Sequence, residues 1–462
     1  MANSANTIRT GSLSSTGAAT TIANAHSADH GVAGDQRRLY ALSDRVAELS
    51  PDESPFFVYL SKVSKVPTTD PVFRFLENRS KIDWTNRSLY ADSALGSLAA
   101  GTSGQVGFDD GAGAAVDWLI KGMVVAVEVV DGKSHAIVRL DSVSVESTQT
   151  TCQVTVLSLG NSSESGYDAI ADGDKAQVIG TAFEEGSGSP DVWSKSLDDD
   201  YGYTQIFKTA AEMTNTAIAT NYRGYANEWQ RIWNLKLREH KVDIERAMLF
   251  GQKGRQNGVQ TSAGLVGDII VRRQAQTPGS ISYSAGNPYF AAAASTSITY
   301  DTFLSDFEVL FDPARGGSSS KLALAGLPVI SYFNKLGAGF VTKSLDTSSS
   351  TESNSNLYNF NATSRDGAFG HKVMMINTVH GDLNLIREPL FRGMSAGLLL
   401  LADMNQLAYR PLVGNGLNRD TSITTNVQQA DEDLRKDMIL TEAGLEITIP
   451  ETHMLYSFTD LN

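Results

Sequence analysis

The feature that most constrains this chain is a long run, Tyr225 to Phe250, that contains neither glycine nor proline. Apolar side chains recur in it at spacings that place them on one side of a helix. The predicted core residues of this helix are Trp229, Trp233, Leu237, Ile244 and Met248. A helix over 225–250 would be about 39 Å long at ~1.5 Å per residue. A rod of that length needs a long sheet, or a neighbouring subunit, to cover its apolar stripe.

The opposite side of the same run carries unlike charges at helical spacing, which favours a solvated face. The three pairs are Glu228 with Arg231, Lys241 with Glu245, and Asp243 with Arg246. Gly251 follows the run and predicts the end of the helix. His240 falls on the apolar side, where we expect a core or interface histidine with satisfied hydrogen bonds and not a catalytic base.

Composition narrows the class of protein. The chain has 462 residues, of which 41% are hydrophobic and 19% charged, as in a soluble globular protein of two or three domains. A net charge of −14 argues against a dedicated nucleic-acid binder, because gripping phosphates requires clustered Lys and Arg. No apolar run reaches the length of a membrane span and no signal-peptide pattern opens the sequence, so we expect a cytoplasmic protein with no membrane partner.

No motif predicts catalysis, a cofactor or a metal site. The single cysteine, Cys152, excludes a cysteine-based metal cluster, and the seven histidines show no ligand spacing. Asp198–Asp200, with Glu184 and Glu185 nearby, could hold a divalent cation, but a solvated loop is the favoured interpretation. The glycine-rich segment 251–258 follows a helix and does not precede one, so it is not a phosphate cradle. We therefore predict a protein that is not an enzyme.

The first half of the chain alternates between small polar segments and short strands. Residues 1–34 hold few large side chains and would need another copy of the chain to order them. Helices are predicted at 36–48 and from Pro55 onward. Strands are predicted at 121–130, 134–140, 150–157 and 175–180, separated by glycine-containing turns. Extended segments precede this block (67–80) and follow it (203–217), so we infer a small β-domain inserted in a long two-stranded excursion.

The second half mixes helices with strands, which makes the fold class α+β. An amphipathic helix is predicted at 300–311, and a second helix at 327–336 follows a buried strand at 321–325. A Ser/Asn-rich loop spans 342–370. The remaining strands are predicted at 372–379, 382–388, 397–402, 406–411, 437–450 and 454–458.

This order of elements, together with several local sequences, resembles the major capsid proteins of tailed phages with the Hong Kong 97-like fold. The subgroup resembled carries a β insertion. The segments that carry the resemblance are Ser54–Leu60, Gly180–Ser187, Tyr203–Lys208, Thr214–Ala217 and Glu239–Gln252. The sequence match covers about residues 50–265, and the rest agrees in element order.

The resemblance implies a division of the chain into named parts. Residues 1–49 would be an N-terminal arm, 50–65 an arm-to-body helix, and 66–218 an extended E-loop with its inserted β-domain at about 116–183. Residues 219–319 would form the peripheral domain with its spine helix, 320–410 the axial domain, and 411–462 the return strands. The residues expected to contact neighbouring subunits are Phe73, Arg74, Phe75 and Arg79 in the E-loop and Leu39 and Leu42 in the arm.

The resemblance also implies a function and partners. Copies of the chain would assemble into hexamers and pentamers of an icosahedral shell that encloses double-stranded DNA without sequence-specific binding. A separate scaffolding protein and a portal are expected, a decoration protein is possible, and the assembled virion would form in the host cytoplasm. The sequence selects no Lys–Asn pair for a cross-link between subunits.

Two alternatives remain open from the sequence. An encapsulin-type bacterial compartment would keep the fold but enclose an enzyme cargo. A hydrolase or carbohydrate-binding surface protein would use the β-domain as a glycan-binding module, and this requires an exposed aromatic platform. Trp118 is the only tryptophan between 116 and 183.

Overall fold

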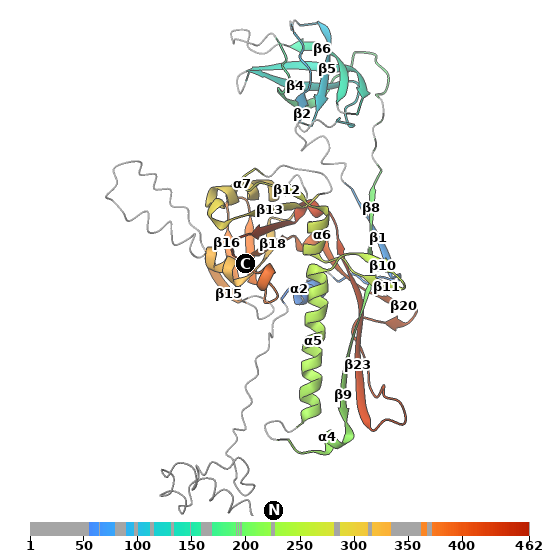
Figure 1. Cartoon of the computed structure of the whole chain (residues 1–462). Coiled ribbons are helices and arrows are strands. Elements are labelled where there is room, and N and C mark those ends of the chain that lie inside the picture. The colour runs from blue at the N-terminus through green and yellow to red at the C-terminus, as the bar shows by residue number, and fades with distance from the viewer. Residues whose placement is uncertain are drawn as a thin grey trace, which may run out of the picture.

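The computed structural model has an α+β architecture in which a long helix, two large sheets and a closed barrel are arranged along an extended molecule (Figure 1). The residues that the structure describes are 55–63, 65–78, 89–96, 100–110, 115–130, 134–147, 149–158, 169–190, 192, 194, 196–222, 227–280, 287–312, 317–333, 362–366 and 372–461. The predicted arm 1–49 with its helix 36–48, Arg79, and most of the loop 342–370 lie outside the described residues. In the described part, no helix is both long enough and apolar enough to cross a membrane.

The predicted long helix is present as α5 (Glu228–Phe250). Its first turn is capped by Asn227, whose side chain accepts the N–H of Gln230 at 3.1 Å. Gly251 ends the helix but has a φ of −60°, so it does not supply the left-handed turn that a terminal glycine commonly provides. Glycine is required there because a Cβ would lie 2.4 Å from the Ala247 oxygen and 2.7 Å from the Ser262 oxygen. The close approach lets α6 (Leu265–Arg272) pack against the end of α5.

A four-stranded sheet provides the surface that α5 needs. The long strand β23 (Leu434–Ile447) pairs along its length with β9 (Gln205–Thr214), and also with β19 (Leu407–Pro411) and β22 (Ser422–Thr424). His240 of α5 lies 2.9 Å from the hydroxyl of Thr209 in β9 and 2.9 Å from that of Thr441 in β23. The prediction of a core histidine with satisfied hydrogen bonds is confirmed. The short helix α4 (Asn215–Ala219) closes the far end of β9.

An eight-stranded mixed sheet lies beside this unit, in the order β12-β13-β24-β18-β14-β17-β16-β15. Its strands, in chain order, are β12 (Gln274–Gln276), β13 (Tyr289–Ala293), β14 (Ser320–Ala325), β15 (Ala362–Asp366), β16 (Lys372–Asn377), β17 (Asp382–Arg387), β18 (Leu398–Ala402) and β24 (Met454–Phe458). Because side chains alternate along a strand, Leu322 and Leu324 enter the core shared with α2 (Pro55–Val63) and α5. Ala323 and Ala325 enter a second core beneath α7 (Tyr300–Leu310) and the helical residues 327–333.

The sheet joins strands from separate parts of the chain. Its strands β12, β13 and β24 come from outside 320–410, the range expected for the axial domain. Parallel pairing of β13 with both β12 and β24 brings these distant segments together. Sequence order alone could not predict this, because the pairing joins strands far apart along the chain.

The block of short strands forms a closed barrel in the order β2-β3-β6-β5-β4-β7. Its strands are β2 (Leu89–Ala91), β3 (Ser103–Asp109), β4 (Met123–Val130), β5 (Ser134–Val145), β6 (Thr150–Ser158) and β7 (Lys175–Thr181). The last four coincide with predicted strands, whereas no strand was predicted at β2 or at β3, which lies in a glycine-rich passage. The barrel therefore begins near residue 89 and not near 116. It encloses its own apolar core, which includes Trp118 and Cys152.

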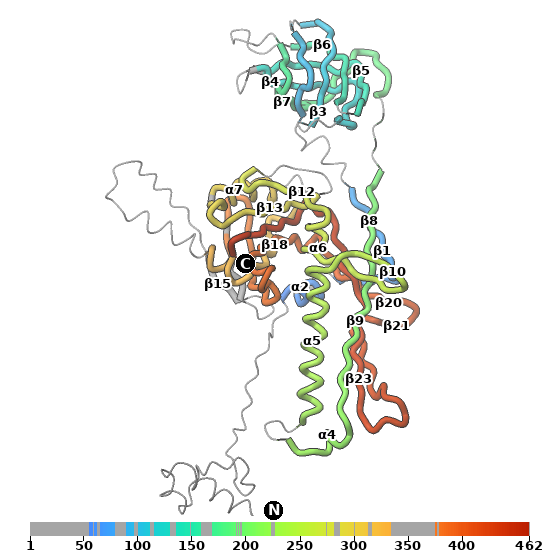
Figure 2. Tube along the Cα trace, viewed as in Figure 1, coloured from blue at the N-terminus to red at the C-terminus, as the bar shows by residue number. Residues whose placement is uncertain are grey.

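Two paired strands connect the barrel to the body. β1 (Val72–Glu77) and β8 (Asp198–Tyr203) are antiparallel, with Val72 opposite Tyr203 and Glu77 opposite Asp198. Figure 2 shows these strands side by side, leading from the body towards the barrel. We call this pair the β1–β8 ribbon. In chain order, the six barrel strands lie between the two strands of this ribbon.

Replacing Ile244 with alanine tests the packing of α5. Ile244 is 1% exposed in the core between α5 and the sheets, so Ile244→Ala should lower the free energy of unfolding by about 2–4 kcal/mol through lost burial and a residual cavity. Ile218→Ala in α4 is the matched control, because that side chain is 42% exposed and should change stability by less than about 0.5 kcal/mol. Denaturant unfolding of both variants measures the difference, and equal effects would contradict the assigned packing.

Candidate assembly interface

The β1–β8 ribbon has two unlike faces, because alternate residues of a strand point to opposite sides. One face carries Arg74 and Leu76 from β1 with Asp199 and Tyr201 from β8. Leu76 is 65% exposed and Tyr201 43% exposed, and Arg74 forms an exposed ion pair with Asp199 at 3.6 Å. We call these four residues the outer face of the ribbon. Exposed leucine and tyrosine bordered by paired charges have the composition of a protein contact surface.

The other face of the ribbon is fixed on its own chain. Phe73 is 5% exposed and lies over two glycines, Gly202 in β8 and Gly444 in β23. A Cβ on Gly202 would approach the Phe73 ring to 2.4 Å, and one on Gly444 would approach it to 2.8 Å. Both positions therefore need glycine for the ring to fit. Phe73 was predicted to contact a neighbouring subunit, and this is corrected: its ring is a buried anchor within the chain.

Ion pairs reinforce this anchor. Asp200 of β8 accepts a bond from Lys253 at 2.8 Å and a second from Arg272 of α6, which also bonds Asp268 at 3.0 Å. Partial burial acts to raise the pKa of Asp200, but the bonds from Lys253 and Arg272 outweigh it and hold that pKa below its usual value. Lys253 also lies 4.6 Å from the centre of the Tyr201 ring. The ribbon is thus attached to the body by charged as well as apolar contacts.

These contacts correct the interpretation of Asp198–Asp200. Asp198–Asp200 is neither a solvated loop nor a candidate cation site, because it forms strand β8 and basic side chains pair with Asp199 and Asp200. Among the residues with described positions, no group of three His, Cys, Asp or Glu side chains is arranged to hold a metal ion.

The segment 251–258 contributes β10 (Gly254–Gln256), which pairs with β11 (Val259–Thr261) around a turn at Asn257 and Gly258. It is a hairpin.

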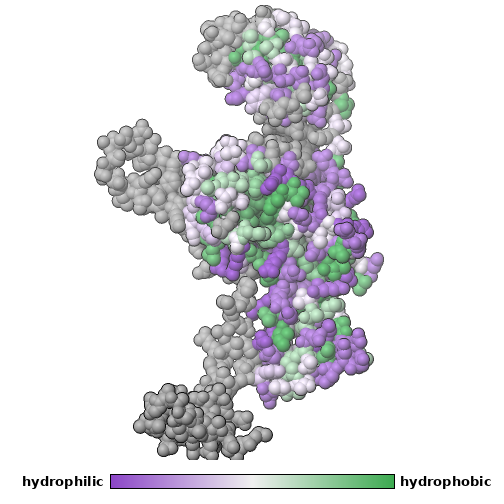
Figure 3. All heavy atoms as spheres, in the orientation of Figure 1, coloured by the Kyte–Doolittle hydropathy of each residue, from purple (hydrophilic) through white to green (hydrophobic). Residues whose placement is uncertain are grey.

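A second, partly covered apolar region lies along the first half of α5. Ile244 and Met248 are buried, but Trp229, Trp233 and Leu237 are only partly covered. The buried stripe is therefore shorter than predicted, because within one chain the sheet and α6 enclose only the second half of the helix. Arg435 of β23 lies 4.7 Å from the Trp229 ring centre. Figure 3 shows hydrophobic patches interspersed with hydrophilic surface on the visible face of the body.

The charged side of α5 also differs from the prediction at one position. Glu228 pairs with Arg231 as expected, at 2.5 Å. Glu245, however, is 0% exposed and faces the core, while Lys241 is exposed, so their predicted pairing is wrong. Helical spacing could not reveal this, because the buried stripe widens where α2 packs against the helix.

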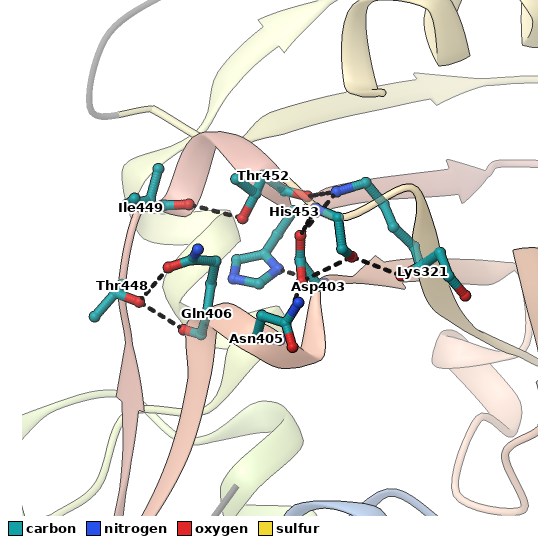
Figure 4. A network of polar contacts seen from close by, with 10 residues as sticks. Lys321, Asp403, Asn405, Gln406, Thr448, Ile449, Thr452 and His453 are labelled. Carbon is teal, nitrogen blue, oxygen red and sulfur yellow. Dashed lines mark hydrogen bonds and ion pairs between the residues drawn. The ribbon is translucent and has the colours of Figure 1, made fainter. Parts of the chain in front are cut away.

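A buried polar network joins the two large sheets at the turn between β23 and β24 (Figure 4). Lys321 of β14 lies 3.4 Å from the Asp403 carboxylate, and both side chains are fully buried. Lys321 also donates to the Thr452 carbonyl at 3.0 Å. His453 accepts the Asp403 N–H on Nδ1 at 3.1 Å. Burial, and then the nearby Lys321 charge, lower the pKa of His453 to about 3, so its ring is neutral.

The ribbon is tied to this same turn. Ile449 has a φ of 45°, a left-handed conformation that is costly for a β-branched residue. Its N–H donates to the buried carboxylate of Glu77, at the end of β1, at 2.9 Å. The ribbon and the sheet junction therefore support one another. Because the network lies within the core and out of contact with solvent, its histidine and lysine act in structure and do not form an open catalytic site.

The predicted contact residues thus have different surroundings. Arg74 is exposed on the outer face, Phe75 is half-buried, and Phe73 is internal. Leu39, Leu42 and Arg79 lie outside the described residues. Leu76, Tyr201 and the Asp200 ion pairs were missed. Side chains alternate between the two sides of a strand, so Leu76 lies on the same side of strand 72–77 as Arg74. This alternation could have identified Leu76 as a contact residue.

A comparison with known protein families shows to which family this chain belongs. A family profile described as SU10 major capsid protein matches residues 15–461. The chain belongs to the SU10 major capsid protein family. The resemblance to tailed-phage major capsid proteins is therefore confirmed, while the subgroup with a β insertion stays a prediction. A search of curated proteins found no match to this chain.

Several solved shell structures resemble this SU10-family chain at low identity. The capsid of a native GTA particle is 9% identical with a TM-score of 0.40, covering 93% of this chain and 97% of the other. The capsid of Myoviridae phage XM1 is 9% identical with a TM-score of 0.39, covering 91% and 96%. The holo-SrpI encapsulin of Synechococcus elongatus is 10% identical with a TM-score of 0.36, covering 58% and 79%. These similarities are too weak to carry an argument, and the family match alone establishes the relationship.

The buried histidine provides a test of the sheet junction by pH. The folded-state pKa of His453 lies below its unfolded value of 6.5. Between about pH 3 and 6.5 the unfolded chain therefore binds a proton at His453 that the folded chain does not bind. The stability contributed by neutral His453 is fully present above pH 6.5 and is lost as the pH falls, by at most about 1.4 kcal/mol per pH unit. His453→Asn keeps an acceptor but does not titrate. The difference in unfolding free energy between wild type and variant should change between pH 6.5 and 4, and a constant difference would contradict the assignment.

Proposed function

We propose that this chain is the major head protein of a tailed phage and assembles into hexamers and pentamers of a closed icosahedral shell around double-stranded DNA. The observation that carries the proposal is the family match over residues 15–461. Its role is structural, with no catalytic, cofactor or metal residue assigned. The shell would be part of the virion and would assemble in the host cytoplasm.

The parts of a Hong Kong 97-like subunit map onto the described elements as follows. The β1–β8 ribbon and its barrel correspond to the E-loop and its insertion, α5 to the spine helix, and the eight-stranded sheet to most of the axial domain. The outer face of the ribbon and the partly exposed tryptophans of α5, Trp229 and Trp233, are the surfaces we assign to contacts between copies. Each is apolar surface that a single chain leaves exposed, as expected of a subunit that completes its contacts by assembly.

The partners follow from the same assignment. A separate scaffolding protein and a portal would direct assembly, and a decoration protein could bind the finished shell. The barrel segment has many more acidic than basic residues, so it would repel DNA phosphates. Packaged DNA is therefore enclosed and not gripped.

The carbohydrate-binding alternative loses its one candidate residue. Trp118 is 2% exposed inside the barrel core and cannot form an exposed stacking platform. An encapsulin-type compartment would share closed shells but would enclose protein cargo. The family match favours the phage protein over both alternatives.

Coexpression with the scaffolding protein tests the proposal. Wild type should form large closed particles visible by negative-stain electron microscopy, whereas Leu76→Glu should reduce particle yield at least about tenfold. A charge in the apolar centre of a contact leaves an unpaired group desolvated at every copy of the interface. The variant chain alone should keep the wild-type circular dichroism and melting temperature, because Leu76 is exposed.

Val145→Glu on the barrel is the matched control, with a side chain 53% exposed and outside the ribbon. It should assemble with more than half of the wild-type yield. Absence of particles from wild type with scaffold would contradict the shell function. Normal assembly of Leu76→Glu would contradict the assigned contact surface while leaving that function intact.

A further inference from the structure

Strand β9 leaves one of its two edges unpaired. Its ten residues form backbone hydrogen bonds with β23 along one edge, and no strand in the described part of the chain pairs with the other. The segment leading into β1 bounds this free edge at one end, where the Thr204 N–H donates to the Pro71 carbonyl at 2.9 Å. Helix α4 bounds it at the other end (Figure 1). A free edge of this length can accept one further strand.

The backbone groups at the free edge belong to the even-numbered residues of β9. The Asn215 N–H bonds the carbonyl of Asp433, directly opposite it, at 3.4 Å. In an antiparallel pair, residues that bond the partner strand alternate with residues whose N–H and C=O groups point away from it. Odd-numbered residues therefore bond β23. The residues whose backbone groups point outward, and whose side chains are also exposed, are Ile206, Lys208, Ala210 and Glu212.

The side chains along this edge are complementary to those of a second, identical edge. When two β9 strands pair antiparallel about Ala210, Lys208 of each copy lies opposite Glu212 of the other. Ala210 lies opposite its own counterpart, so two small side chains meet at the centre. Ile206 lies opposite Thr214, which brings the ends of the two free edges into register. One two-fold axis through Ala210 thus aligns both edges with their charges matched.

The charges on the edge are available for this pairing. Lys208 has no ion-pair partner among the residues that the structure describes. Glu212 pairs with Lys436 of β23 at 3.0 Å, and both side chains are largely exposed. A second copy would therefore place Glu212 between Lys436 of its own chain and Lys208 of the other. A lone lysine on an edge commonly prevents strand addition, but here each lysine meets a glutamate.

We propose that β9 is an interface between two copies of this chain, which pair edge to edge across a two-fold axis and join their four-stranded sheets into one continuous sheet. Each copy contributes the same residues, so the contact closes after two copies and does not propagate. The interface is distinct from the outer face of the ribbon. It deepens the proposed shell function, on which its place between subunits of a shell rests, but the pairing can also be measured on free copies.

A cysteine at the centre of the edge tests the pairing. In Ala210→Cys the two new thiols would face each other at a Cα separation of about 5.5 Å, which a disulfide can span. The native Cys152 is buried and does not compete. The full chain, both free at high concentration and coexpressed with the scaffolding protein, would be mildly oxidised and analysed on non-reducing gels. Most of it should migrate as a linked dimer, with the link at position 210 identified by mass spectrometry.

Ile206→Cys is the matched control, because it lies on the same edge and its side chain is 50% exposed. In the proposed register its two copies lie roughly 27 Å apart along the strands, at ~3.4 Å per residue, so almost none should link. A mixture of Ile206→Cys with Thr214→Cys should link, since these positions lie opposite each other. Equal linkage of Ala210→Cys and Ile206→Cys would overturn the pairing, and so would unlinked Ala210→Cys in both samples.

The charges give a second test in the Ala210→Cys background. Adding Lys208→Glu places two glutamates opposite each other on both sides of the axis and should reduce the linked fraction at least about threefold. Lys175→Glu, at an exposed position of barrel strand β7, makes the same change of charge away from the edge and should leave the linked fraction unchanged. An unchanged linked fraction with Lys208→Glu would overturn the charge-matched register.

The outcomes separate this interface from the shell function. Closed particles in which Ala210→Cys stays unlinked would contradict the interface and leave the shell function intact. Linked dimers without particles would support the interface and contradict the shell function.

Discussion

The packing of β1 across β23 is the contact on which the rest of the structure depends. Here the Phe73 ring fills the space left by two glycines, Gly202 and Gly444. Farther along β1, the Glu77 carboxylate accepts the N–H of Ile449 in the turn before β24. One short strand thus holds the ribbon on the body and supports a strained turn between the two large sheets.

The junction between the sheets is polar, although it lies in the core. Lys321, Asp403 and His453 are fully buried, and their hydrogen bonds run between β14, the segment after β18, and the turn before β24. A buried ion pair contributes little net stability compared with apolar packing, but breaking one member leaves an uncompensated charge. Such a network therefore favours one relative arrangement of the sheets. For a subunit that must fit many identical neighbours, a unique arrangement matters more than additional stability.

Much of this fold could be predicted from local sequence pattern. The absence of glycine and proline over 225–250 predicted α5, and short runs at 121–130 and 150–157 separated by glycine-containing turns predicted barrel strands. Strand β3 was missed because Gly104 and Gly107, which lie against Leu95 and Gln149, weaken the strand pattern. The pairing of β13 with β24 and the burial of Glu245 depend on contacts between distant segments, which no local window contains.

The outward side of the candidate interface could not be predicted from the sequence, for a related reason. Residues 72–77 were recognised as a contact strand, but which side faces outward depends on the register with β8 and on the two glycines beneath Phe73. That information lies far away along the chain. Exposed Leu76 and Tyr201 become recognisable as one surface only when the ribbon is formed.

The central claim is that one face of the ribbon belongs to its own chain and the other to a neighbouring copy. Electron cryo-microscopy of assembled particles tests this most directly. The account predicts that Phe73 remains over Gly202 and Gly444 of its own subunit while Leu76 and Tyr201 are covered by another copy. Particles in which Leu76 and Tyr201 stay exposed to solvent, or in which Phe73 inserts into a neighbour, would contradict it.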